Sequence, residues 1–334
     1  MKKLAVVTFC VTLLSIGLIA SAEGTNAGSF ARDGIGARAL AMGGSFVGVA
    51  DDSSAGFWNP AGVAYMSGYR LGGMSVVGGQ FGIPDIEYYD LSLLAKPIQT
   101  GSVSSLGVGI TWISHVVSGI PYTGDDGGTF SDTQSLFLVS LAWPFDLGDW
   151  SLAVGTNLKY YRHTLLTGVG SGLGADLGVL LNGSVGTVPI SFGFVSMDTL
   201  ETTINWSGTQ HNPVNYVPWI LKGGGSLVLM DGTLRLSADV DFSPAAIHSE
   251  LERYSNLDRL HLGMEIVPIE QLALRGGLIL WRDGTRRWSA GVGLIPWDGM
   301  SLDYAYERQQ GGLGGETHIL SVDFEFSNLL RALK

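Results

Sequence analysis

The feature that most constrains the fold is an alternation of apolar and polar residues that recurs along residues 67–326. In the stretch 233–242, Leu234, Leu236, Val240 and Phe242 alternate with Arg235, Ser237, Asp239 and Asp241. A repeat of two residues places one set of side chains on each face of a β-strand. Fourteen segments of this kind follow one another. We therefore expect antiparallel strands with one apolar and one polar face.

The composition indicates where such strands lie. Hydrophobic residues make up 46% of the chain, yet beyond residue 22 no uninterrupted apolar run reaches the roughly 18 residues needed for a spanning helix. A closed β-barrel is the other structure that satisfies its backbone groups in a bilayer. The 49 glycines and 20 tryptophans and tyrosines (9 Trp, 11 Tyr) fit closely paired strands with aromatic ends. The sequence thus predicts an all-β fold, a transmembrane antiparallel β-barrel of about 14 strands.

The lengths of the connections support this prediction. Short connections at 146–149, 182–186, 231–232, 268–269 and 296–299 fall at every second junction, and longer ones at 117–133, 163–171, 198–217 and 243–256 lie between them. Outer-membrane barrels have short periplasmic turns and longer outer loops. We expect the short connections to face the periplasm.

The first 22 residues have the pattern of a secretory signal peptide. Lys2 and Lys3 precede an apolar run, and Ala20-Ser21-Ala22 is a small-residue cleavage site. The only cysteine, Cys10, lies inside this segment, so the mature chain is expected to have no thiol chemistry. The predicted division is a signal peptide at 1–22, an N-terminal segment at 23–66, the barrel at 67–326 and a tail at 327–334.

Charge and motif spacing argue against several function classes. Without Lys2 and Lys3 the chain has 17 basic and 30 acidic residues, which makes nucleic acid an unlikely partner. The six histidines have no metal-ligand spacing, and no nucleophile with a base can be identified. We expect no catalytic residue, no metal, no cofactor and no enzyme activity.

The stretch 34–64 differs from the rest of the chain. It is rich in small residues, contains Asp51-Asp52-Ser53-Ser54 as a helix start, and ends in the turn former Asn59-Pro60-Ala61-Gly62. Its distinctive residues are Arg38, Met42, Gly43, Gly44, Asp51, Asp52, Trp58, Asn59, Pro60, Ala61 and Gly62. As a block it resembles the N-terminal segment of the outer-membrane long-chain fatty acid transporter (FadL-like) family and of the smaller PorV/PorQ-type barrels. The resemblance implies a hatch folded inside the barrel mouth.

Two functions from different classes are consistent with this resemblance. The first is passive uptake of hydrophobic or amphipathic small molecules across the bacterial outer membrane, with Leu40, Phe46, Val47 and Phe57 contacting the ligand. The second is a PorV/PorQ-like interaction or shuttle component of a protein secretion and surface-attachment system, which would bind secretion-system proteins or cargo; the chain length of 334 residues favours it. In both, outer-membrane lipid surrounds the barrel.

The inward face of the predicted strands carries charges of both signs. They either line a conduit or form an ion-paired plug in a narrow barrel, and the mixture of signs favours the plug. The predicted lumen-facing residues are Arg235, Asp239, Asp241, Arg259, Glu265, Arg275, Arg287, Asp303, Glu307 and Asp323.

Overall fold

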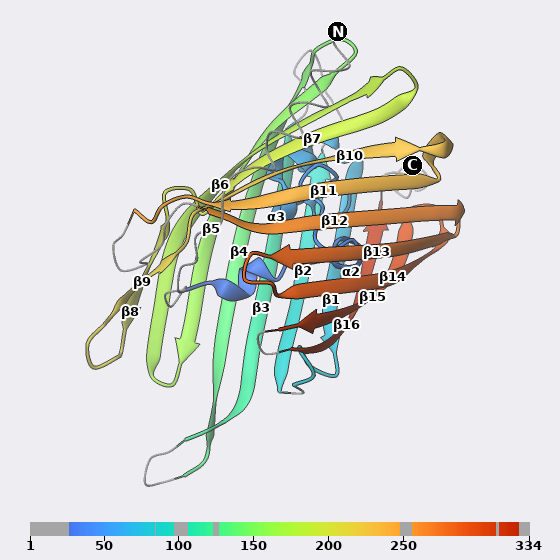
Figure 1. Cartoon of the computed structure of the whole chain (residues 1–334). Helices are drawn as coiled ribbons and strands as arrows, with labels where there is room; N and C mark the ends of the chain where they lie inside the picture. The colour runs from blue at the N-terminus through green and yellow to red at the C-terminus, as the bar shows by residue number, and fades with distance from the viewer. Residues whose placement is uncertain are drawn as a thin grey trace.

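The computed structural model describes residues 27–83, 85–96, 106–122, 127–247, 256–311 and 314–326. Strands dominate these residues, as the alternation predicts (Figure 1). Fourteen of them form the barrel wall: β1 (Gly68–Val77), β2 (Ile86–Lys96), β3 (Gly107–Pro121), β4 (Thr129–Asp146), β5 (Ser151–Leu165), β6 (Gly168–Val185), β7 (Val188–Met197), β10 (Ile220–Leu229), β11 (Leu234–Ser243), β12 (Asn256–Ile269), β13 (Leu272–Trp281), β14 (Arg286–Trp297), β15 (Met300–Gln310) and β16 (Gly315–Glu325).

The wall closes on itself. Each of these strands pairs antiparallel with its neighbours along the chain, β7 pairs with β10, and β1 pairs with β16. The pairing of β5 with β6 completes the ring. The predicted count of 14 wall strands is therefore confirmed. Closure leaves none of the fourteen wall strands listed above at an open edge, which is what a barrel in lipid requires.

The two faces of the wall differ as the alternation predicts. On β2, Leu91 and Leu93 are 52% and 48% exposed on the outside, whereas Tyr88 and Ser92 are buried on the inside. Neighbouring side chains on a strand point to opposite faces, so the wall presents an apolar surface outward and a surface of mixed polar and apolar side chains inward. None of the helices in the described ranges is long and apolar enough to cross a membrane.

The predicted connections at 117–133, 182–186 and 268–269 are shorter than expected, because β3, β4, β6 and β12 run into them, and two predicted loops are wrong. The stretch 163–171 is largely strand, because β5 and β6 continue into it and only two residues, 166 and 167, connect them. The stretch 198–217 contains the additional strands β8 (Thr202–Ser207) and β9 (Val214–Val217), a hairpin that pairs with β6. A Cβ on Gly170 would lie 2.9 Å from the Trp206 ring, so the absence of a side chain there makes room for this hairpin.

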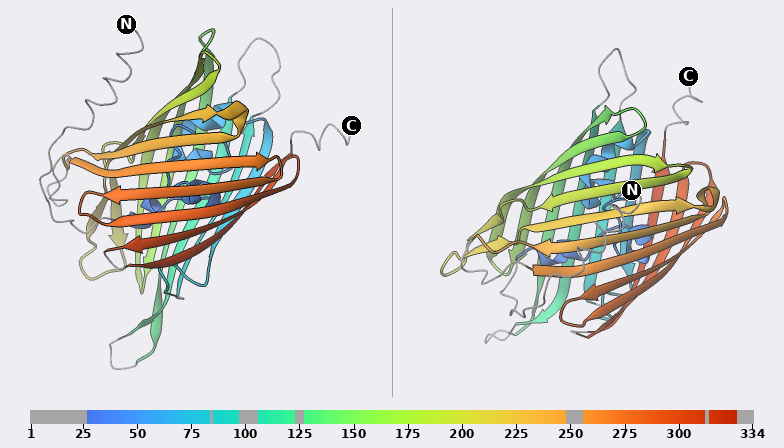
Figure 2. Two further views of the ribbon diagram at one scale, coloured as in Figure 1. Left: turned by 45° about the vertical axis from the view of Figure 1, so that its right-hand side comes forward. Right: turned by 45° about the horizontal axis from the view of Figure 1, so that its top comes forward.

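Residues 27–66, called here the inner segment, lie inside the barrel (Figures 1 and 2). Their elements are short: η1 (Ser29–Arg32), α2 (Ala37–Ala41), α3 (Ala55–Trp58) and η2 (Pro60–Tyr65); η3 (Met230–Gly232) is a turn of the wall. The apolar side chains of the inner segment and of the inward wall form the buried core. The core thus fills the lumen instead of lying between layers.

Candidate functional site

The inner segment packs against glycines of the wall. A Cβ on Gly263 would lie 2.6 Å from the Met42 carbonyl oxygen, and a Cβ on Gly107 would lie 2.5 Å from the Val63 carbonyl oxygen. Such distances do not occur for real Cβ atoms, so these positions must lack a side chain. The same close approach to inner-segment backbone recurs around the ring at Gly155, Gly193 and Gly277. We call these five residues the glycine belt; through it the inner segment packs directly on the wall backbone.

The turn at Asn59 joins the inner segment to itself and to the wall. The fully buried Asn59 amide donates to the carbonyl oxygens of Val47 and of Val179 on β6, both at 3.0 Å, and its Oδ1 accepts from the Ala61 amide at 3.1 Å. Pro60 begins η2, where a missing N–H costs nothing. A Cβ on Gly62 would overlap the Ala50 carbonyl. The predicted turn residues therefore fix the path of the chain, because the Asn59 side chain and Gly62 contact backbone groups of neighbouring segments.

Arg38 lies at the centre of an ion-pair cluster. Its guanidinium contacts Glu265 of β12 at 2.8 Å and Asp51 at 2.5 Å, and Asp52 lies 3.5 Å away. Arg275 of β13 contacts Glu265 at 2.7 Å and Asp303 at 2.5 Å. Charges on the inner segment and on three wall strands thus compensate one another. This arrangement supports the ion-paired plug over the open conduit.

The other predicted inward charges are distributed around this cluster. Asp239 accepts from the Val47 amide at 2.8 Å, and Asp241 contacts Lys222 at 3.0 Å. Arg259 lies over the Trp281 ring at 5.1 Å and does not join the Arg38 cluster through any contact among the described residues. The remaining pairs are Arg235 with Asp51, Arg287 with Glu307 and Asp323 with Arg70.

Phe46 contacts one residue from each of two cavities. It is fully buried, with the Arg38 guanidinium 5.2 Å from its ring centroid and the Trp58 ring 6.1 Å away. Arg38 lines a cavity toward the short turns of the barrel, and Trp58 lines a cavity at the opposite end. Trp58 also donates its indole N–H to the Ile35 carbonyl at 2.9 Å. The inner segment therefore separates the two ends of the lumen at this point.

The outer cavity is small and mostly apolar. It measures about 20 Å³, and its apolar wall comprises Ala31, Phe57, Trp58, Met197, Val217 and Ile220. Lys222 and Lys159 also line it, but Lys222 contacts Asp241 and Lys159 contacts Asp176 and Asp198. Of the four residues expected to contact a ligand, Phe57 belongs to this described wall. Leu40, Phe46 and Val47 do not, and are buried in the core.

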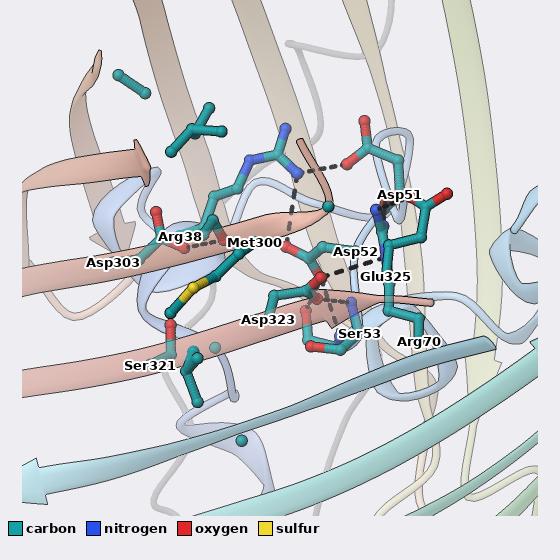
Figure 3. A pocket seen from close by; sticks show the side chains of 18 of the residues that line it. Arg38, Asp51, Asp52, Ser53, Arg70, Met300, Asp303, Ser321, Asp323 and Glu325 are labelled. Atoms are coloured by element: carbon teal, nitrogen blue, oxygen red, sulfur yellow. Dashed lines mark hydrogen bonds and ion pairs between the residues drawn. The ribbon is translucent and has the colours of Figure 1, made fainter. Parts of the chain in front are cut away.

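The inner-mouth cavity is larger and polar (Figure 3). It measures about 300 Å³ and lies between the inner segment and the wall strands β1, β2 and β12–β16. The Ser53 amide donates to Asp323 at 2.7 Å across it. Burial raises the pKa of the Asp52 carboxyl above its usual range, although Arg38 opposes this shift. Its lining carboxylates are Asp51, Asp52, Asp90, Glu265, Asp298, Asp303, Asp323 and Glu325, and its arginines are Arg38, Arg70 and Arg275.

Sequence reasoning missed several residues of both cavities. Arg70 belongs to β1, whose alternation is weak. Asp90 belongs to β2, whose polar face carries few charges. Lys222 precedes three glycines, which hide the alternation of β10. Asp198 follows β7 directly, and it pairs with Lys159 of β5, 39 positions away in the sequence. Among the described residues, no group of three His, Cys, Asp or Glu side chains is placed to bind a metal ion.

Solved structures with the same fold were found, although no family model and no curated protein sequence matches the chain. The toluene transporter TbuX of Ralstonia pickettii aligns with a TM-score of 0.56 at 13% identity, over 88% of this chain and 98% of that one. The toluene transporter TodX of Pseudomonas putida gives 0.56 and 13% over the same shares. The CymD monoaromatic hydrocarbon channel gives 0.57 and 11%, again over 88% and 98%. The chain therefore has the fold of these proteins, and the predicted antiparallel β-barrel of about 14 strands is confirmed.

Proposed function

We propose that this protein mediates passive uptake of hydrophobic or amphipathic small molecules across the bacterial outer membrane. The observation that supports it most strongly is the fold likeness to three channels described as carrying toluene or monoaromatic hydrocarbons, which extends over 88% of this chain. In this proposal residues 1–22 direct export, 23–66 act as the hatch, 67–326 form the barrel and 327–334 are a tail. The protein acts without cofactor, metal or catalytic residue.

The outer cavity is the proposed entry site. Aromatic and aliphatic side chains form the larger part of its lining. Five charged residues line it too, and the two lysines among them are paired with carboxylates: Arg32, Lys159, Asp198, Lys222 and Asp241. Apolar ligands gain free energy in proportion to the apolar surface that they and their site remove from water. Because the cavity holds only about 20 Å³, the inner segment must shift for a ligand to pass. Phe57 and Trp58 are the inner-segment residues that a ligand meets first.

The test is accumulation of labelled toluene and of a labelled long-chain fatty acid in intact cells, normalised to folded barrel in the membrane. Ile220→Trp adds a large side chain to the wall of the outer cavity, whereas alternation places Leu221 on the lipid-facing side, which makes Leu221→Trp its matched control. Uptake reduced by Ile220→Trp and retained by Leu221→Trp supports the proposal. Equal rates for both variants and for cells without the protein oppose it.

The tight packing of the lumen favours a second candidate function. The glycine belt leaves no room between the inner segment and the wall at Gly193 and Gly277, as expected for a barrel that does not conduct. The alternative is an interaction component of a secretion and surface-attachment system, which binds its partners on the outer loops and the β8–β9 hairpin. Absence of barrel-dependent uptake together with cross-linking of Gln210 to a secreted protein in cells would favour this alternative.

A further inference from the structure

A groove of about 530 Å³ lies on the outward face of the wall, along β14, β15, β16 and β1. Gly73 and Ser75 of β1 pair with Val322 and Leu320 of β16, and the smaller side chains on β1 leave a recess beside β16. Three residues that alternation turns inward also border the groove: Met74, Asp303 and Ser321. Its outward side chains are 37% to 51% exposed: Val292, Leu294, Leu302, Tyr304 and Leu320. The groove therefore offers an apolar surface to a hydrocarbon chain that lies along the strands.

Charged side chains lie beyond one end of this groove. Tyr304 of β15 lines the groove, and Arg308 follows four residues later on the same face, about 13 Å away at the rise of a β-strand. Arg308 pairs across the strands with Trp288 of β14 and Glu316 of β16. Arg286 lies two residues before Trp288 and is also exposed on the outward face. The same three strands thus carry an apolar groove and, beyond its end, two arginines.

The two arginines give this surface an excess of positive charge. Glu316 is the only carboxylate among the outward side chains of the described strands β14–β16, and it contacts Arg308 at 3.5 Å with both side chains about half exposed. Arg286 has no ion pair among the described residues. It pairs with Gln310, which makes it a diagonal neighbour of Arg308, at about 7–8 Å. Because guanidinium groups bind phosphate through parallel hydrogen bonds, a phosphate between these arginines can contact both.

Exposed aromatic rings lie beside the arginines. The ring centroids of Trp288 and Tyr306 are 5.2 Å apart, and Trp288 is 37% exposed. Tyr306 lies 5.3 Å from the His318 ring, whose Nδ1 is 2.7 Å from the Tyr304 hydroxyl. Aromatic residues of this kind are enriched at the membrane–water interface, so the arginines lie at the level of lipid headgroups and the groove at the level of acyl chains. An exposed aromatic face beside a phosphate site also suits the apolar face of a sugar ring.

We propose that this face of the barrel binds a phosphorylated glycolipid of the outer leaflet. Its phosphate contacts Arg286 and Arg308, and one of its acyl chains occupies the groove. Charge complementarity selects the headgroup, and the apolar lining selects the chain. The orientation predicted from connection lengths agrees, because Arg286 and Arg308 lie at the end of the barrel opposite the short turns at 146–149 and 296–299. The site is outside the wall, so it does not depend on uptake through the lumen, and either proposal can fail without the other.

The first experiment is native mass spectrometry of the full chain, folded in detergent micelles and titrated with lipid A. We expect one bound lipid A per barrel, with binding at least tenfold weaker in the double variant Arg286→Gln/Arg308→Gln. Arg162 is an exposed arginine near the outer end of β5, so Arg162→Gln is the matched control and should bind normally. No saturable binding, or equal affinity in the double variant and the control, overturns the proposal. Tighter binding of phosphatidylglycerol than of lipid A overturns the assignment to a glycolipid.

A second pair of variants tests the groove. Ser75→Trp fills the recess, whereas Leu158→Trp adds the same ring to a residue of β5 that is 59% exposed and outside the groove. Lipid A binding at least fivefold weaker in Ser75→Trp and unchanged in Leu158→Trp is expected, with heat-modifiable mobility showing that both variants are folded. Equal binding by the two variants contradicts the placement of the acyl chain.

A third measurement needs no variant. Phenylglyoxal modifies accessible guanidinium groups, and mass spectrometry of peptides locates the modified arginines. Lipid A should protect Arg286 and Arg308 and leave Arg162 as reactive as before. Equal reactivity of Arg286 and Arg308 with and without lipid A contradicts the headgroup site.

Discussion

The Arg38 guanidinium of the inner segment donates two hydrogen bonds to the Glu265 carboxylate of β12, at 2.8 Å and 3.0 Å. A parallel pair of bonds between an arginine and a carboxylate fixes orientation as well as distance. Glu265 also accepts from Arg275 of the next wall strand. This relationship connects residues 227 positions apart and joins the inner segment to the barrel wall.

Loss of Glu265 should destabilise the barrel strongly. Glu265→Ala leaves Arg38 and Arg275 buried without their shared partner, and removal of one member of a buried pair costs about 3–5 kcal/mol. The control is Glu316→Ala, which breaks the half-exposed pair with Arg308 at 3.5 Å and should cost about 0–1 kcal/mol. Urea unfolding of both variants in micelles measures the difference. Similar unfolding midpoints would show that the Arg38 cluster is not structural.

Two adjacent glycines of β13 should respond differently to alanine. A Cβ on Gly277 would overlap the Gly43 amide, whereas a Cβ on Gly276 would have no atom within 4 Å. Overpacking costs about 1–3 kcal/mol, so Gly277→Ala should lower the free energy of unfolding by that amount and increase proteolysis of the inner segment. Gly276→Ala should resemble the unmodified protein. Equal stability of the two variants would contradict the direct seating of the inner segment on the glycine belt.

Asn59→Ala should affect both folding and flux. The change leaves the Val47 and Val179 carbonyls and the Ala61 amide without their side-chain partner in a buried place. Each unsatisfied group costs about 1–3 kcal/mol. We expect a lower folded yield, seen as loss of heat-modifiable mobility, and an altered uptake rate per folded barrel. An unchanged normalised rate would mean that this turn only closes the barrel.

The orientation in the membrane can be tested by cysteine labelling, since the only cysteine lies at position 10. Gln210→Cys places a thiol between β8 and β9, and Asp149→Cys places one on the short turn between β4 and β5. Because long connections face outward, an impermeant maleimide added to intact cells should label only the first. Labelling of Asp149→Cys alone would invert the orientation.

Much of the wall could be predicted from the sequence because the alternation within each strand is enough to assign its two faces. Leu236 and Asp239 are assigned to opposite faces by their spacing alone, and the structure exposes the first at 37% and the second at 2%. The site depends instead on contacts between distant residues. Nothing near Gly277 indicates that Gly43 lies against it, and nothing at the start of β6 indicates that the β8–β9 hairpin pairs with it.

The ion-pair partners of the charged residues in the cavities could not be predicted for the same reason. Alternation places Glu265 inward, but only the fold brings Arg38 and Arg275 to it. Phe46 was expected to contact a ligand because it is apolar, and it packs between Arg38 and Trp58 instead. A large apolar residue in the inner segment can equally fill the core or line a passage, and the sequence does not distinguish the two.

The measurement that tests the central claim most directly is the initial rate of labelled toluene accumulation in intact cells that produce the unmodified barrel, compared with otherwise identical cells that lack it. The rate is normalised to the amount of folded barrel in the outer membrane. Passive uptake through the barrel predicts a rate that increases with the amount of barrel, saturates with toluene concentration and does not need metabolic energy. A rate equal to that of barrel-free cells, at every level of folded protein, would contradict the uptake function.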